Sequence, residues 1–226
     1  MMQNKLPRNY LVVLALFTAF SLLCLVIRNF AEGNTIYNFL LWNLFLALVP
    51  LAMALILHFF VGKLNKVIII VGSFLWLLFY PNAPYMISDL IHVNNTNAMV
   101  LYDTLIIFSF SMLALFYGFY SIKIIHFCYR QITNKRTAHF VIAASIILSS
   151  AGIYLGRILR LNSWDLFTHP LQTMGTILDH LWPINKNPST YVIILLFSFI
   201  QFFLLIMMKD LDEIEKESLI SGRYTG

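Results

Sequence analysis

Charged residues are scarce in this 226-residue sequence, where Asp, Glu, Lys and Arg together make up 11% of the chain. Soluble domains carry about 25% charged residues. Hydrophobic residues instead account for 60% of the chain, and the mean hydropathy is +0.79. This balance excludes an ordinary soluble domain and indicates a membrane protein.

Cysteine and catalytic motifs are scarce as well. Cys24 and Cys128 are the two cysteines, and both sit in or beside apolar runs. They suggest neither a disulfide framework nor a zinc site. The sequence has no P-loop, G-x-S-x-G elbow, dinucleotide fingerprint or H-E-x-x-H motif. We therefore expect no cofactor, no metal and no nucleic-acid partner.

What the chain does contain is a series of long apolar runs. A helix needs about 20 apolar residues to cross the hydrocarbon of a bilayer. Six runs approach or exceed this length, over residues 10–27, 36–61, 67–93, 98–125, 138–161 and 191–208. We predict an all-α membrane protein with one six-helix domain over residues 1–208 and a short polar cytoplasmic tail over residues 209–226.

The flanking Lys and Arg residues predict the orientation of these spans, because cytoplasmic flanks carry the excess of positive charge. One side collects eleven: Lys5, Arg8, Lys63, Lys66, Lys123, Arg130, Lys135, Arg136, Lys209, Lys216 and Arg223. The other side has four: Arg28, Arg157, Arg160 and Lys186. Both termini are therefore expected in the cytoplasm.

The third run is interrupted by the string "YPNAPYMISDLIH". Pro81 disfavours helical geometry at Tyr80 and, like Pro84, lacks a backbone donor. We predict that regular helix ends near Tyr80, in a break or kink, and that Asn82 caps the helix that follows. If helix then resumes, Asp89 and His92 share one polar face with Ser88. The alternative is a simple kink with both side chains in external water.

Several polar residues sit at the predicted outer ends of the other runs. Ionisable residues within spans usually face the bundle interior and mark a site. The candidate acid or base residues are Asp89, His92 and Asp103, and the candidate ligand-binding residues are Asn82, Arg157, Arg160, Asn162 and Asp165. A structural alternative remains, in which Asp89 and Asp103 pair with Arg157 and Arg160 as a buried clasp.

An amphipathic helix is predicted between the fifth and sixth spans. Leu171, Met174, Leu178 and Leu181 recur at helical spacing, Pro170 suits the start of a helix, and a proline at 183 suits its end. Such a helix lies on the outer leaflet or over the mouth of the bundle.

Four strings carry a family resemblance: "LWNLFLALVPL", "YPNAPYMISDLIH", "LYDTLII" and "GIYLGRILRLNSWDLF". Together they resemble the bacterial membrane proteins grouped as the domain-of-unknown-function family numbered 1361, over residues 41–167. The resemblance implies a multi-pass protein of a bacterial plasma membrane and supplies no activity. It also implies that Asn82, Pro84, Asp89, Asp103, Arg157, Arg160, Asn162 and Asp165 are the positions to test.

Three functions are compatible with the sequence. In the first, the outer cluster binds or modifies an anionic, lipid-linked or cell-envelope ligand, since arginine contacts phosphate or carboxylate through two hydrogen bonds. In the second, the protein is a non-catalytic scaffold whose charge cluster is a clasp. In the third it is a small transporter, because carriers build substrate sites at discontinuous helices. The sequence does not give the ligand or the oligomeric state.

The orientation can be tested by cysteine accessibility in a Cys-free background. Thr96→Cys and Thr173→Cys are expected to react with an impermeant reagent from outside the cell, because they follow the ends of the spans that have few flanking Lys and Arg residues. Thr133→Cys is expected to stay unlabelled. The reverse labelling pattern would contradict both the orientation and an external site.

Overall fold

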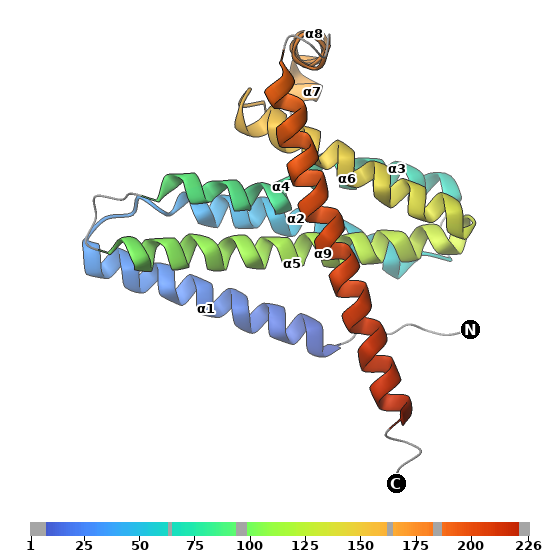
Figure 1. The fold of residues 1–226 in the computed structure, drawn as a ribbon, viewed down its shortest axis with the longest axis horizontal. Coiled ribbons are helices and arrows are strands. Elements are labelled where there is room, and N and C mark those ends of the chain that lie inside the picture. The colour runs from blue at the N-terminus through green and yellow to red at the C-terminus, as the bar shows by residue number, and fades with distance from the viewer. Residues whose placement is uncertain (1–7, 63–64, 94–98, 162–164, 183–186, 222–226) are drawn as a thin grey trace. The chain divides into compact units, whose positions relative to one another are not determined.

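The computed structural model describes residues 8–62, 65–93, 99–161, 165–182 and 187–221. Every regular element within these residues is a helix (Figure 1). The α-helices are α1 (Arg8–Glu32), α2 (Phe39–Phe60), α3 (Lys66–Phe79), α4 (Asn82–Tyr85), α5 (Val100–Ile132), α6 (Lys135–Arg157), α7 (Asp165–Thr168), α8 (Pro170–Leu181) and α9 (Pro188–Ser221), and η1 (Met86–His92) is a 3₁₀-helix. The all-α prediction is confirmed.

Six segments of the described chain are long and apolar enough to cross a membrane. They are Tyr10–Glu32, Phe39–Phe60, Lys66–His92, Val100–Ile132, Lys135–Arg157 and Pro188–Met207. They coincide with the six predicted runs, although α1 and α5 extend several residues further than their apolar composition indicated. The chain is a multi-pass membrane protein.

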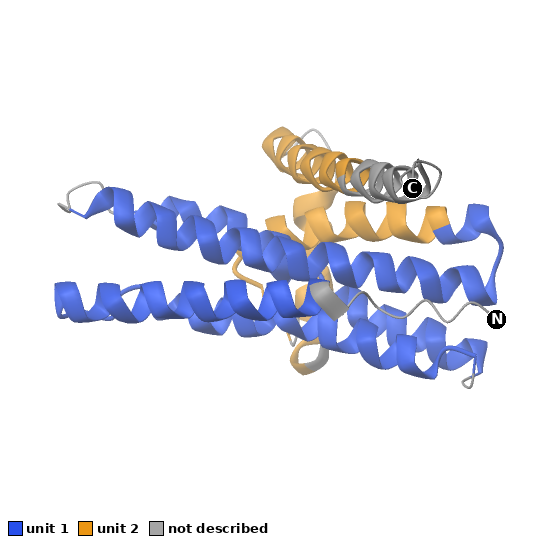
Figure 2. Ribbon diagram, turned by 90° about the horizontal axis from the view of Figure 1, so that it is seen from below, with its two compact units in different colours: residues 1–138 blue, residues 139–226 orange. Residues whose placement is uncertain are grey.

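The chain divides into two compact units, residues 1–138 and residues 139–226 (Figure 2). The boundary falls inside α6, where no change of composition marks it in the sequence. Within the second unit, Gln201 Nε2 of α9 donates a hydrogen bond of 2.9 Å to Ser150 Oγ of α6, and both side chains are buried. Hydrogen bonds between polar side chains are a common link between helices in lipid.

Helix α5 is the centre of the first unit. Of the residues in the most apolar stretch of α5, 72% are buried, whereas only 17% are buried in the corresponding stretch of α1. Helix α5 therefore packs against protein, and α1 mainly faces outward. Helices α1, α2, α3, α4 and η1 all contact α5. The buried stripe of α2 includes Leu40, Leu44, Ala47, Leu51 and Ala54, spaced alternately four and three residues apart. The two alanines are small enough to let neighbouring helices approach closely.

The third span changes its hydrogen bonding at Pro81. Helix α3 ends at Phe79, the short α4 follows, and the chain continues as the 3₁₀-helix η1. Tyr80 and Pro81 both keep right-handed helical dihedral angles. The α-helical pattern is thus interrupted, while a kink of the helix axis stays a prediction.

The predicted role of Asn82 is wrong in detail. Asn82 is the first residue of α4, whose N-cap is Pro81 and has no side-chain cap. The Asn82 side chain instead donates from Nδ2 to the carbonyl of Phe79 at 2.9 Å, so it satisfies the end of α3. Further along, the Met86 carbonyl accepts a hydrogen bond of 2.6 Å from Ser111 Oγ of α5. Protein groups therefore satisfy backbone carbonyls of the interrupted segment, as burial in a membrane requires.

Gly118 of α5 lets α4 approach closely. A Cβ atom at Gly118 would lie 2.9 Å from the Ala83 Cβ of α4 and 3.5 Å from the Tyr80 ring. Ala83 and Tyr80 are almost fully buried, so neither can move aside into open space. The interrupted span thus sits against α5 at a point where only glycine fits.

We predict that Gly118→Ala destabilises the protein by about 1–3 kcal/mol, the usual cost of overpacking a core. Gly175→Ala is the matched control, because nothing lies within 4 Å of a Cβ there and alanine favours helix. Thermal unfolding in detergent measures both variants. Equal stability of the two would show that the contact between α4 and α5 is loose.

Candidate functional site

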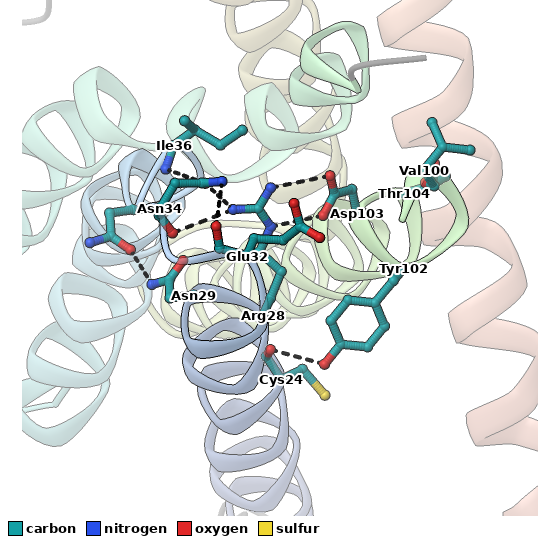
Figure 3. A network of polar contacts seen from close by, with 11 residues as sticks. Cys24, Arg28, Asn29, Glu32, Asn34, Ile36, Val100, Tyr102, Asp103 and Thr104 are labelled. Atoms are coloured by element: carbon teal, nitrogen blue, oxygen red, sulfur yellow. Dashed lines mark hydrogen bonds and ion pairs between the residues drawn. The ribbon is translucent and has the colours of Figure 1, made fainter. Parts of the chain in front are cut away.

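A buried ion pair joins α1 to α5. Arg28 Nε donates to Asp103 Oδ1 at 2.9 Å, and Arg28 Nη2 donates to Oδ2 at 3.4 Å (Figure 3). Both side chains are 0% exposed. The contact therefore uses both oxygens of the carboxylate in a two-bond geometry.

The loop between α1 and α2 completes the surroundings of Arg28. Arg28 Nη1 donates to the side-chain oxygen of Asn34 and, at 3.4 Å, to its carbonyl. The guanidinium carbon also lies 4.7 Å from the centroid of the Tyr37 ring, within cation–π range. From here on, the clasp means Arg28, Asn34, Tyr37 and Asp103, a different set from the pairing of Asp89 and Asp103 with Arg157 and Arg160 that the sequence suggested. It fixes the end of α1, the following loop and the start of α5 together.

The energetic weight of the clasp comes from its burial. Two charges lose their hydration when they are buried, and only good geometry with further hydrogen bonds compensates. The cation–π contact and the Asn34 acceptors supply those further interactions. Removal of one partner leaves the other charge uncompensated in a low-dielectric surrounding, so we assign Asp103 a structural role.

A second buried acid lies at the same end of the first unit. Asp89 of η1 is 1% exposed, and its Oδ2 accepts a hydrogen bond of 2.8 Å from Asn43 Nδ2 of α2. The neighbouring His92 is exposed, and its ring lies 5.2 Å from that of Phe39 in an edge-on contact. Three different elements therefore place a polar side chain in a buried or half-buried position near this end: α2 with Asn43, η1 with Asp89 and α5 with Asp103.

The second unit holds the other predicted residues. Arg157 is half-buried at the last position of α6, and Asp165 is half-buried at the first position of α7. Arg160 is exposed and has a positive φ of 56°. Asn162 lies outside the described residues. The convergence of Asp89 and Asp103 with Arg157 and Arg160 stays a prediction.

Helix α8 has the predicted bounds, and three of the four residues of the predicted apolar stripe are exposed, while Leu181 is half-buried. Leu171, Met174 and Leu178 are all exposed. Thr173 is 4% exposed, and its Oγ1 donates to the Asp165 carbonyl at 3.1 Å. Thr173 was therefore the wrong choice for accessibility labelling, and the exposed Gln172 is the better position. Nearby, Leu161, Asp165, His169, Gln172, Thr173 and Thr176 line a depression of about 170 Å³.

Metal binding finds no support in the described part of the chain, where no three His, Cys, Asp or Glu residues form a group that could hold an ion.

Arg28, Asn34 and Tyr37 are site residues that the sequence analysis missed. Arg28 entered it only as a flanking charge, since the first apolar run was taken to end at residue 27. The sequence signal that could have identified it is the stretch after Arg28, which can continue the helix. In the structure α1 runs through this stretch to Glu32, so Arg28 lies inside the span. Its partner Asp103 is 75 residues away in the sequence.

We predict that Arg28→Ala lowers the free energy of unfolding by about 3–5 kcal/mol, because it strands the buried Asp103 carboxylate. The double variant Arg28→Met, Asp103→Leu should recover part of this loss, since no charge then remains unpaired. Arg130→Ala, at an exposed position, serves as the control and should change stability by less than about 0.5 kcal/mol. Thermal unfolding in detergent measures the stability of the three variants. A double variant less stable than Arg28→Ala would contradict the clasp.

One family model matches the chain, over residues 42–204, and its description is Protein of unknown function (DUF1361). No curated protein and no solved structure matches. The match runs from α2 into α9, so it includes Asp89, Asp103, Arg157 and Arg160 but not α1 with Arg28. The chain belongs to the DUF1361 family of proteins of unknown function.

Proposed function

We propose that this protein resides in a bacterial plasma membrane with both termini in the cytoplasm and binds an anionic, lipid-linked or cell-envelope ligand at its outer face. Arg160 is the principal contact. Arg157, Asn162 and Asp165 are the neighbouring ligand-binding residues, and Asn82 of the first unit stays a candidate from the sequence. The orientation rests on the eleven-to-four distribution of Lys and Arg in the flanks.

The observation that carries the proposal is the backbone of Arg160. Its φ of 56° lies in the left-handed region, which costs a residue with a side chain about 1–2 kcal/mol and which glycine adopts freely. The position follows the end of α6, where the Leu161 amide reaches back to the Leu155 carbonyl at 3.1 Å. Glycine is the usual residue at such a helix end.

A structural reason for arginine at this position is too weak to balance that cost. A cation near the C-terminus of a helix gains about 0.3–1 kcal/mol from the helix dipole when it is exposed. Arg157 already provides a cation in the last turn of α6. An exposed arginine held in a strained conformation is therefore better explained by what its guanidinium binds. Phosphate and carboxylate match the guanidinium with two parallel hydrogen bonds.

Binding is favoured over catalysis by the state of the three candidate acid or base residues. Asp89 and Asp103 are buried, and each has a hydrogen-bonded partner. His92 is exposed, and its ring contacts that of Phe39. Its role as an acid or base therefore stays part of the proposal, subordinate to binding.

A non-catalytic scaffold is the second candidate function. The clasp favours it, because a buried ion pair closed by a loop and an aromatic ring holds one end of the first unit together without any ligand. In this alternative the protein presents an extracytoplasmic platform to a partner.

The variant Arg160→Gly separates ligand binding from folding. Glycine removes the guanidinium and relieves the left-handed strain, so we expect unchanged or slightly raised stability, by up to about 1 kcal/mol. We also expect loss of the anionic lipids or small molecules that co-purify with the wild-type protein, measured by mass spectrometry.

Arg136→Ala is the matched control, since Arg136 is an exposed arginine at the opposite end of α6 and should keep the co-purified ligand. Equal ligand retention by the wild type and Arg160→Gly would overturn the proposed function and leave the scaffold.

A further inference from the structure

The depression beside α8 has an unusual lining for a protein with a net charge of +5. Its walls are formed by Leu161, Asp165, His169, Gln172, Thr173 and Thr176. Among the described residues, the lining thus contains one carboxylate, a histidine, an amide and two hydroxyls, and neither Lys nor Arg. Such a lining attracts an ammonium group or hydroxyls and disfavours an isolated phosphate.

The size of the depression restricts the ligand further. Pockets for drug-sized ligands and cofactors measure roughly 300–1,000 Å³. At about 170 Å³ the depression suits a small polar group and not a nucleotide or a flavin.

Helix α8 turns its other side away from the depression. By the 3.6-residue period, Gln172, Thr173 and Thr176 share one face, and Leu171, Met174 and Leu178 lie on the opposite one. These three apolar side chains are 89%, 46% and 57% exposed, and Trp182 just after the helix is 69% exposed. An amphipathic helix with a tryptophan at its end is typical of the interface between headgroups and acyl chains.

The neighbouring helices hold α8 at that interface. The candidate span Lys135–Arg157 precedes it and the candidate span Pro188–Met207 follows it. Both ends of the α7–α8 segment are thereby tied to the membrane boundary. The apolar face of α8 can then lie among acyl chains while the depression opens at headgroup level.

Arg160 is the cation nearest to the depression along the sequence. It directly precedes Leu161, which is part of the lining together with Asp165. A carboxylate offers about four acceptor sites, so Asp165 can accept from a ligand in addition to its contacts within the protein.

We propose that this depression binds the headgroup of a zwitterionic phospholipid, with the phosphate on Arg160, a primary ammonium on Asp165, and the acyl chains along the apolar face of α8. This inference rests on the proposed function, because it uses Arg160 as the anion contact. It narrows the lipid-linked ligand to a phosphatidylethanolamine-like lipid, of which the phosphate is the anionic group that Arg160 contacts. A primary ammonium is specified because it can donate hydrogen bonds to the carboxylate, which a trimethylated ammonium cannot.

The test compares two lipids presented together to the full-length protein. Nanodiscs of phosphatidylcholine contain equal small fractions of phosphatidylethanolamine and phosphatidylglycerol, and the lipids retained after detergent extraction are counted by native mass spectrometry. The wild type should retain more phosphatidylethanolamine than phosphatidylglycerol. Asp165→Asn should lower the retention of phosphatidylethanolamine by about threefold to tenfold, as loss of one net hydrogen bond does, and so lower the ratio of phosphatidylethanolamine to phosphatidylglycerol that is retained.

The controls lie on the same segment. Asp165→Asn preserves the backbone carbonyl that accepts from Thr173, so the turn into α8 is kept. Asp179→Asn removes an exposed acid of α8 that is not part of the lining and should match the wild type. Gln172→Ala, at an exposed position of the lining, gives a second variant expected to lower phosphatidylethanolamine retention should Asp165→Asn not fold.

The outcomes separate the two proposals. Equal retention of both lipids by the wild type, or equal behaviour of Asp165→Asn and Asp179→Asn, overturns the headgroup site. If Arg160→Gly still loses phosphatidylglycerol in that case, the proposed anion-binding function stands alone. If Arg160→Gly loses neither lipid, both proposals fail.

Discussion

The first unit of this membrane protein depends on one interaction, the buried pair of Arg28 and Asp103. A carboxylate with no exposed surface at the start of the central helix α5 is stable only if a cation accompanies it. That cation comes from α1, which lies outside the part of the chain matched by the DUF1361 model. The most exposed long helix of the unit, α1, is thus held in place because the buried Asp103 of α5 needs the Arg28 cation. The loop with Asn34 and Tyr37 completes the clasp.

The interruption of the third span shows that buried uncharged polar groups also need partners. Prolines at 81 and 84 remove two backbone donors, and each freed carbonyl in a membrane must find another partner. Side chains of Asn82 and Ser111 donate to nearby carbonyls, and Gly118 allows the segment to sit directly against α5. The irregular backbone is therefore supported by protein and not by lipid.

The charges of the second unit are arranged differently. In the first unit Asp89 and Asp103 are buried and each accepts a hydrogen bond from a partner side chain, whereas Arg160 is exposed on a strained backbone next to a residue that lines a small depression with Asp165. Burial with satisfied partners indicates a structural role, and exposure with strain indicates a ligand. This contrast is why the ligand-binding proposal is centred on Arg160, while Asp103 is assigned to the clasp.

The sequence alone determined the membrane class, the six apolar helices and the bounds of α8, because these follow from composition and from periodicity within short stretches. It also identified Asp89 and Asp103 as residues that need partners. Only the tertiary structure decided that Arg28 pairs with Asp103, because 75 residues separate them and apolar runs do not specify which helices touch. The 3₁₀ form of η1, the donor role of Asn82 and the left-handed backbone of Arg160 were likewise decided by packing and chain geometry, which local propensity does not encode.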